Sequence, residues 1–213
     1  MVETFWARIV GVSLIVFPLM LLAGFLMHPN ILSFKMTKSA TELIAKFHHQ
    51  RKFHAGHLIV FAAVPFIIAA MVYLAGLPLE RGRLWVFFGG IVGVIGAVIL
   101  AGDKGALCIV LSSFDSLPEK DFSMITPALS AIVERKGLLV IFYLLPLLPL
   151  GAAAQLVGLI MDGRLNPVMG IATIVGLILL NNPDLEVISS VGSLLMCVGY
   201  IPLGLSVLKG TLQ

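Results

Sequence analysis

The sequence predicts an all-α integral membrane protein: a bundle of about six transmembrane helices with two amphipathic surface helices on one face, which we expect to be cytoplasmic. Of its 213 residues, 59% are hydrophobic and only 12% are charged, whereas a soluble domain has about 25% charged residues. The mean hydropathy is +1.07. Apolar runs of about 20 residues, long enough to cross a hydrocarbon core about 30 Å thick, recur along the chain. We therefore expect residues 1–213 to form a single polytopic membrane domain.

The charge balance and the cysteines argue against several other classes of protein. The net charge of +3 is accounted for by the excess of Lys and Arg in cytoplasmic loops of membrane proteins, so we expect a lipid bilayer as partner and no nucleic acid. Cys108 and Cys197 lie inside apolar runs without a C-x-x-C pair, which argues against a thiolate metal site. The chain also lacks a serine-centred elbow, a P-loop, an H-E-x-x-H motif and a dinucleotide fingerprint. A non-enzymatic protein is therefore favoured, although membrane enzymes with diffuse motifs stay open.

Six apolar stretches form the expected transmembrane helices: residues 5–27, 57–77, 84–108, 138–161, 165–180 and 187–208. The first is too long for a signal peptide and has no small-residue cleavage site after it, so we expect a retained helix. The fifth has only about 16 residues, which is the lower limit for crossing a bilayer. A bundle of five spans with a re-entrant segment at residues 165–180 is the alternative.

The first expected surface helix lies between the first two spans. Ser39 and Glu42 fit a capping box, in which each side chain satisfies a free backbone N–H at the start of a helix. Leu43, Ile44 and Phe47 continue it as an apolar stripe. This pattern is typical of a helix that lies on a membrane surface.

The second expected surface helix lies within residues 115–137. Thr126 and Pro127 make a good N-cap and first-turn pair, and Gly137 can end the helix. Its apolar stripe consists of Ile125, Leu129, Ile132 and Val133.

The third span carries a regular stripe of small residues. It consists of Gly89, Gly93, Ala97, Ala101 and Gly105. Such a stripe lets two helix backbones approach closely in lipid, where packing drives helix association. The partner is either another helix of the same chain or a second copy in a homo-oligomer or larger membrane complex.

Asp103 and Lys104 interrupt the apolar run of the third span. If residues 84–114 were helical throughout, the helix would be about 46 Å long, so either its end projects into water or it breaks at Gly102 and Gly105. Charged residues in spans usually face a cavity or a partner. We expect His54 or His57 to be the partner of Asp103, because a carboxylate can fix the tautomer of an imidazole.

Four of the five histidines lie within ten residues, where a basic segment enters the second span: His48, His49, His54 and His57. Residues three or four apart share a helix face, so His54 and His57 are neighbours. Imidazoles can ligate haem iron or a transition metal or relay protons. The candidate metal ligands are His28, His49, His54 and His57, and the candidate ligand or proton site is Asp103, Lys104, His54 and His57. Alternatively, the histidines face anionic lipid headgroups together with Lys46, Arg51 and Lys52.

The basic residues predict which way the chain crosses the membrane. The loops after the first and third spans contain eight: Lys35, Lys38, Lys46, Arg51, Lys52, Lys120, Arg135 and Lys136. The opposite face contains five: Arg8, Arg81, Arg83, Arg164 and Lys209. The positive-inside rule then places both termini outside and the long loops in the cytoplasm of a prokaryotic inner membrane. With six spans, all five histidines, Asp103, Lys104, Asp184 and Glu186 lie at or near one face.

Three functions are consistent with these features. The first is a non-enzymatic membrane subunit or transport-type protein with a His/Asp polar site at one leaflet. The second is a haem- or metal-dependent membrane redox enzyme that uses the cluster from His48 to His57. The third is a scaffold that binds anionic lipid. The sequence favours them in that order.

Overall fold

The computed structural model describes residues 2–29, 31–32, 39–181 and 186–212, without the side chains of residues 2–4, 46 and 47. Over these residues the chain is helical and contains no strand, which confirms the all-helical prediction. The expected Lys35, Lys38 and Asp184 lie outside the described residues, as does the side chain of Lys46.

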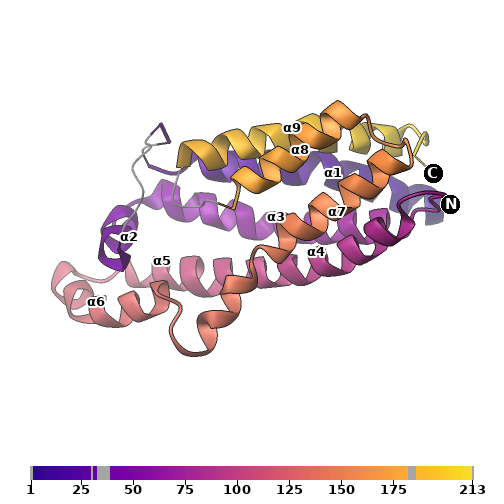
Figure 1. Ribbon diagram of the computed structural model, residues 1–213. Helices are drawn as coiled ribbons and strands as arrows, with labels where there is room; N and C mark the ends of the chain where they lie inside the picture. Colours follow the sequence, from indigo (N-terminus) through magenta and orange to yellow (C-terminus); the bar gives the residue numbers. More distant parts are fainter. Residues whose placement is uncertain (1, 30, 33–38, 182–185, 213) are drawn as a thin grey trace.

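The long apolar helices run side by side along the molecule (Figure 1). They are α1 (Val2–Leu26), α3 (Arg51–Ala75), α4 (Arg83–Asp103), α7 (Leu147–Met161), α8 (Pro167–Leu179) and α9 (Glu186–Leu208). The two short helices α2 (Ala40–Phe47) and α6 (Glu119–Val133) lie at one end. At the other end α1 begins and α9 ends (Figure 1).

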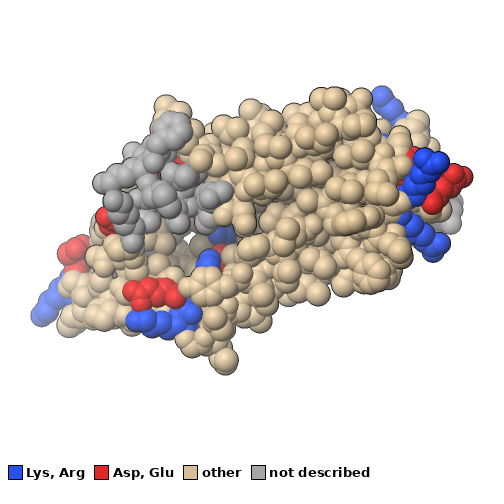
Figure 2. Space-filling model, viewed as in Figure 1, with Lys and Arg blue, Asp and Glu red and all other residues tan. Residues whose placement is uncertain are grey.

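Five helical stretches of the described chain are long and apolar enough to cross a membrane: Phe5–Leu26, Arg51–Ala75, Arg83–Phe114, Gly137–Met161 and Glu186–Leu208. The helix Pro167–Leu179 is shorter, at 13 residues. Charged side chains gather at the two ends of the molecule and leave a broad uncharged belt between them (Figure 2). The helices are thus compatible with a bilayer, whereas the count of six spans stays a prediction.

The helix that begins as α4 does not break at Gly102 or Gly105, contrary to one of the two expectations. It widens into the π-helix η1 (Lys104–Ile109) and continues as α5 (Val110–Phe114). Asp103 and Lys104 lie where α4 passes into η1 and form an ion pair, with 3.3 Å between Lys104 Nζ and Asp103 Oδ2.

Glycines face one another where the long helices cross. A Cβ atom on Gly89 would lie 2.7 Å from the carbonyl oxygen of Gly151 in α7, and one on Gly11 would lie 3.0 Å from that of Gly204 in α9. Further pairs are Gly24 with Gly56 and Gly176 with Gly192. Such contacts bring helix backbones together where lipid supplies no hydrophobic drive.

The small-residue stripe of α4 thus packs largely within the chain. Gly89 and Gly93 lie against α7, where a Cβ on Gly151 would collide with the backbone of Gly93. Ala97 is fully buried and Ala101 packs against the core. Gly105 differs, because a Cβ there would meet nothing within 4 Å.

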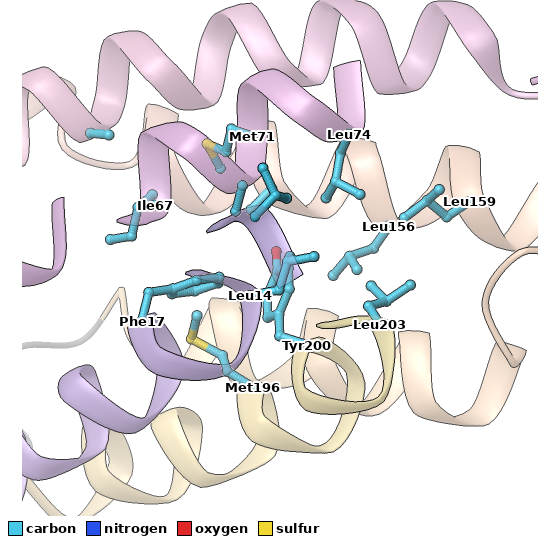
Figure 3. Close-up of a cluster of buried hydrophobic side chains, with 14 of the residues drawn as sticks. Leu14, Phe17, Ile67, Met71, Leu74, Leu156, Leu159, Met196, Tyr200 and Leu203 are labelled. Atoms are coloured by element: carbon cyan, nitrogen blue, oxygen red, sulfur yellow. The ribbon is translucent and has the colours of Figure 1, made fainter. Parts of the chain in front are cut away.

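The core lies where α1, α3, α7 and α9 meet (Figure 3). Its labelled side chains include Leu14, Ile67, Leu156 and Leu203. Phe17 and Tyr200 pack edge to face, with ring centres 4.7 Å apart. Packing of this kind holds α1 and α9 together along their length.

The two short helices differ in part from expectation. Ser39 Oγ accepts a hydrogen bond of 3.1 Å from the Glu42 N–H, which confirms the predicted start of α2. α6 begins at Glu119 rather than after Thr126, and Pro127 lies inside it. The expected N-cap there is wrong because the Thr126 hydroxyl donates to the Phe122 carbonyl of the same helix.

The apolar stripes of α2 and α6 pack together. Ile44 of α2 and Leu129 of α6 are buried in one small cluster with Phe53 of α3 and Leu111 of α5. These stripes therefore attach the two short helices to the end of the bundle.

Candidate functional site

A cavity of about 310 Å³ lies between the long helices, within the size range of small-molecule sites. Most of its wall is apolar and comes from α1, α3, α4, α7 and α9, with Phe17, Leu21, Val60, Ile67 and Leu148 among the lining residues. The polar lining at one end comprises His28, His54, His57, Asp103, Lys104, Arg135 and Glu186. Near this end the molecular surface has a hollow in which acidic and basic side chains are visible (Figure 2).

Asp103 is the centre of the charged end and is only 2% exposed. Its Oδ1 accepts a hydrogen bond of 3.1 Å from Nη2 of Arg135, and its Oδ2 lies 3.3 Å from Nζ of Lys104. The expected partner was His54 or His57, but His54 bonds to Asp115 instead. Two cations share one buried carboxylate, so this group of three carries one excess positive charge.

Arg135 reaches Asp103 from a strained position. Its φ of 54° lies in the left-handed region, and among the described residues His49, at 58°, is the only other non-glycine residue with positive φ. Such conformations cost of order 1–3 kcal/mol and persist where the surrounding structure enforces them, often at functional sites. Each of the two residues directly follows the C-cap of a short helix, Glu134 of α6 and His48 of α2, where a left-handed residue commonly ends a helix.

His28 and His57 form the other side of the charged end. Nδ1 of His57 lies 2.9 Å from the Phe53 carbonyl. Since a carbonyl only accepts, Nδ1 carries the proton and Nε2 has the lone pair. The His28 ring stacks on that of His57 at 4.8 Å, and its Nδ1 lies 3.8 Å from Glu186 Oε1. The ends of α1, α3 and α9 thereby place three titratable groups beside the cavity.

Asp115 organises a second cluster, which joins α2, α3 and α5. Its carboxylate accepts hydrogen bonds from His48 Nδ1 at 2.6 Å, from the His49 N–H at 2.8 Å and from His54 Nε2 at 3.1 Å. Nε2 of His48 also bonds to Glu119 Oε2 at 3.0 Å. A histidine that donates to two carboxylates through both nitrogens is an imidazolium.

The pKa values of this second cluster shift accordingly. The hydrogen bond to Glu119 is the largest cause of the raised pKa of His48; burial opposes it and Asp115 adds to it. Burial alone would raise the pKa of Asp115, but the hydrogen bonds from His49, His48 and His54 outweigh it and hold that pKa below its ordinary value. Both shifts favour the charged forms, the imidazolium of His48 and the carboxylate of Asp115.

The four expected metal ligands are divided between the two clusters. His28 and His57 lie at the cavity, His54 bonds to Asp115, and His49 is exposed beside Glu119. Two axial ligands of one haem iron bind on opposite sides of the metal, so the iron separates their two rings. The stacked rings of His28 and His57, 4.8 Å apart, do not fit that arrangement.

Gln155 of α7 lines the far part of the same cavity. Its Nε2 donates to the carbonyl of Met71 at 2.9 Å and to that of Val86 at 3.2 Å, so the amide bonds α7 to both α3 and α4. Its Oε1 is buried and has no hydrogen-bond partner in the part of the chain that the structure describes.

Sequence reasoning identified Asp103, Lys104 and His57 but missed Arg135 and Gln155 as cavity residues. Arg135 follows an expected surface helix. In the sequence it is only one of the basic residues of the loop after the third span. Gln155 is an isolated amide within the apolar run of residues 138–161, where a hydrogen bond to a neighbouring helix is the usual role. Arg51 and Lys52 are exposed. Their contact with lipid headgroups stays a prediction.

A search of protein-family models, of curated proteins and of solved structures found no match for this chain.

Proposed function

We propose that this protein is a non-enzymatic membrane protein of transport type that binds an amphiphilic anion in its cavity, with the head group at the charged end. The observation that carries the proposal is that two cations, Lys104 and Arg135, share one carboxylate, Asp103, at the polar end of a cavity whose wall is mostly apolar. An apolar chain is suited to the long apolar wall. A carboxylate or phosphate is suited to a guanidinium, which forms strong charge-assisted hydrogen bonds.

The proposal includes a placement in the membrane. Six spans put both termini on the outer face of a prokaryotic inner membrane and the long loops in the cytoplasm. The excess of basic residues in the loops after the first and third spans supports this orientation. The charged end of the cavity then opens toward the cytoplasmic leaflet.

Binding of a long-chain fatty acid tests the proposal. We would incorporate the chain into nanodiscs and measure the binding of palmitate and of the matching neutral alcohol. Arg135→Gln should weaken palmitate binding by at least about tenfold and leave the binding of the alcohol unchanged. Lys136→Gln is the matched control, because Lys136 is the next residue but its side chain is 67% exposed and pairs with Glu134.

Retained binding of the alcohol shows that the Arg135→Gln variant is folded. The proposal fails if palmitate does not bind the native chain, or if Arg135→Gln and Lys136→Gln bind it equally well.

A metal-dependent function is the second candidate. It is favoured by His48, His49 and Glu119, whose possible ligand atoms all lie within 4.8 Å of one another. A metal there would have to displace the proton that His48 donates to Glu119. Metal analysis and an absorption spectrum of the purified protein test this candidate: about one metal per chain, lost in His48→Ala, would support it.

A further inference from the structure

We infer that the ligand of this cavity carries a second polar group, a hydroxyl, at the end of its apolar chain remote from the head group. The inference rests on the proposed function and deepens it, because it names the class of ligand: an elongated amphiphile such as an ω-hydroxy fatty acid. It follows from Gln155, whose carbonyl oxygen is buried without a partner among the described residues.

The orientation of the Gln155 amide is fixed by its own nitrogen. Nε2 donates to two backbone carbonyls, those of Met71 and Val86. A flipped amide would put its oxygen against both carbonyls, where no hydrogen bond can form. Oε1 is therefore held in place as an acceptor, in a side chain that is only 1% exposed and lines the cavity.

Gln155 and Asp103 mark opposite ends of a long cavity. The amide of Gln155 lies level with Gly90, since a Cβ on that glycine would be 2.9 Å from Nε2. Gly90 and Asp103 belong to the same helix α4 and lie about 20 Å apart along its axis, at about 1.5 Å per residue. A ligand that reaches both groups is accordingly long and narrow.

The acceptor selects the chemistry of the far end of the ligand. An amide oxygen accepts and does not donate, so its partner must bear an O–H or N–H. A ligand hydroxyl can donate to Gln155 Oε1, which a plain alkyl end cannot.

A buried water is the simplest competing occupant. Buried waters typically make about three hydrogen bonds. The wall around Gln155 includes Met71, Leu74 and Ala152, whose side chains offer no strong donor or acceptor. A single acceptor in such a wall suits the end of an apolar chain better than it suits an isolated water.

Three probes that differ only at the chain end test the inference: palmitate, ω-hydroxypalmitate and ω-methoxypalmitate. Their affinities for the chain in nanodiscs would be measured side by side. We expect ω-hydroxypalmitate to bind about tenfold more tightly than the other two, the size of one net hydrogen bond. The ω-methoxy acid has an oxygen at the chain end but no O–H, so it shows whether binding needs a hydrogen-bond donor there or only an oxygen.

One variant locates the effect. Gln155→Met should remove the preference for the ω-hydroxy acid. If Gln155→Met does not fold, the three probes on the native chain decide. The ω-hydroxypalmitoyl chain would also be assayed as its lysophosphatidate ester. Tighter binding of the ester would identify a phospholipid as the ligand, and tighter binding of the acid would identify a free fatty acid.

Equal affinity of the three acids, as expected if only a water sits at Gln155, overturns the inference but leaves the proposed function intact. A preference that survives in Gln155→Met also overturns it. Failure of all three acids to bind overturns the proposed function itself.

Discussion

The carboxylate of Asp103 is the residue on which the charged end of the cavity depends. It is nearly fully buried and holds both Arg135 and Lys104 by contacts of 3.1 and 3.3 Å. Removing one member of a buried ionic group leaves the other charges uncompensated, which costs more than the group itself contributes to stability.

Asp103→Asn should therefore destabilise the protein while strengthening anion binding. We expect its free energy of unfolding to fall by about 3 kcal/mol, and palmitate to bind more tightly because two cations are then available. Thermal unfolding in detergent with and without palmitate measures both effects, since a ligand that binds the folded state raises stability. Asp121→Asn, an exposed change in α6, is the control and should shift stability by no more than about 0.5 kcal/mol. A variant that is as stable as the native chain would contradict this role.

Single residues show how far the sequence could predict the site. Asp103 and His57 stand out because a polar residue in an apolar run is costly. The partners of Asp103 were mispredicted for two reasons. Adjacent residues of a helix do not face each other, so the pair with Lys104 was not expected, and Arg135 is 32 residues away along the chain. The conformation of a long loop does not follow from spacing in the sequence.

At the scale of helices, the crossing of α4 and α7 is set by glycines. Gly151→Ala should destabilise the bundle by about 1–3 kcal/mol, because its Cβ would overlap the backbone of Gly93 and the helices must move apart. Gly105→Ala is the matched control, since a Cβ there meets open space. Thermal unfolding of the two variants in the same detergent compares them. Equal losses of stability would show that the close approach does not matter.

The attachment of α2 to α6 should depend on pH through His48 and Asp115. Because the pKa of His48 is raised, its stabilisation is complete below about pH 6.5 and is lost as pH rises through the raised value. Because the pKa of Asp115 is lowered, its contribution is present above about pH 3.9 and is lost as pH falls through the lowered value. The attachment is therefore firmest between about pH 4 and 6.5.

Spin labels on exposed positions of α2 and α6 measure this attachment. Labels at Thr41→Cys and Ser123→Cys, with Cys108 and Cys197 replaced by alanine, should give a narrow distance distribution near pH 6 that broadens as pH rises past the raised pKa of His48. His48→Gln should abolish that change. A distribution that is the same at both pH values in the native background would contradict the mechanism.

The expected helices match the structure better than their ends do. The apolar runs predicted all the long helices, because a run of about 20 apolar residues has few alternatives in a bilayer. The start of α6 was misplaced by eight residues, since Thr126 and Pro127 have the composition of a helix start but lie inside a longer helix. Packing of Phe122 and Leu129 against α2 and α3 outweighs that local preference.

At the scale of the whole molecule, the two ends of the bundle differ in their chemistry. One end holds the described histidines, Asp103 and Glu186, whereas the other holds Asp162, which accepts from the Arg81 N–H at 2.7 Å and pairs with Arg164. This separation follows from an antiparallel arrangement of helices, in which alternate loops meet at the same end.

The proposed orientation predicts which loops can be reached from outside. In a background without native cysteines, Glu80→Cys should react with an impermeant maleimide in intact cells, and Ser123→Cys should react only after the cells are opened. Both positions are exposed but lie at opposite ends. The reverse pattern would invert the orientation. Labelling of Asn181→Cys only in opened cells would show that α8 crosses completely, and its labelling in intact cells would favour five spans.

The charged end of the cavity lies at one end of the bundle, and the wall beyond it is apolar as far as Gln155. Under the proposed function, a long amphiphile would enter the bundle with its tail leading and stop where its head meets Arg135. To leave, it would have to draw its whole tail back past His57 and Asp103. Loading and unloading should both slow as the tail lengthens, so the protein would exchange its cargo with the slow turnover of a carrier rather than the continuous flow of a pore.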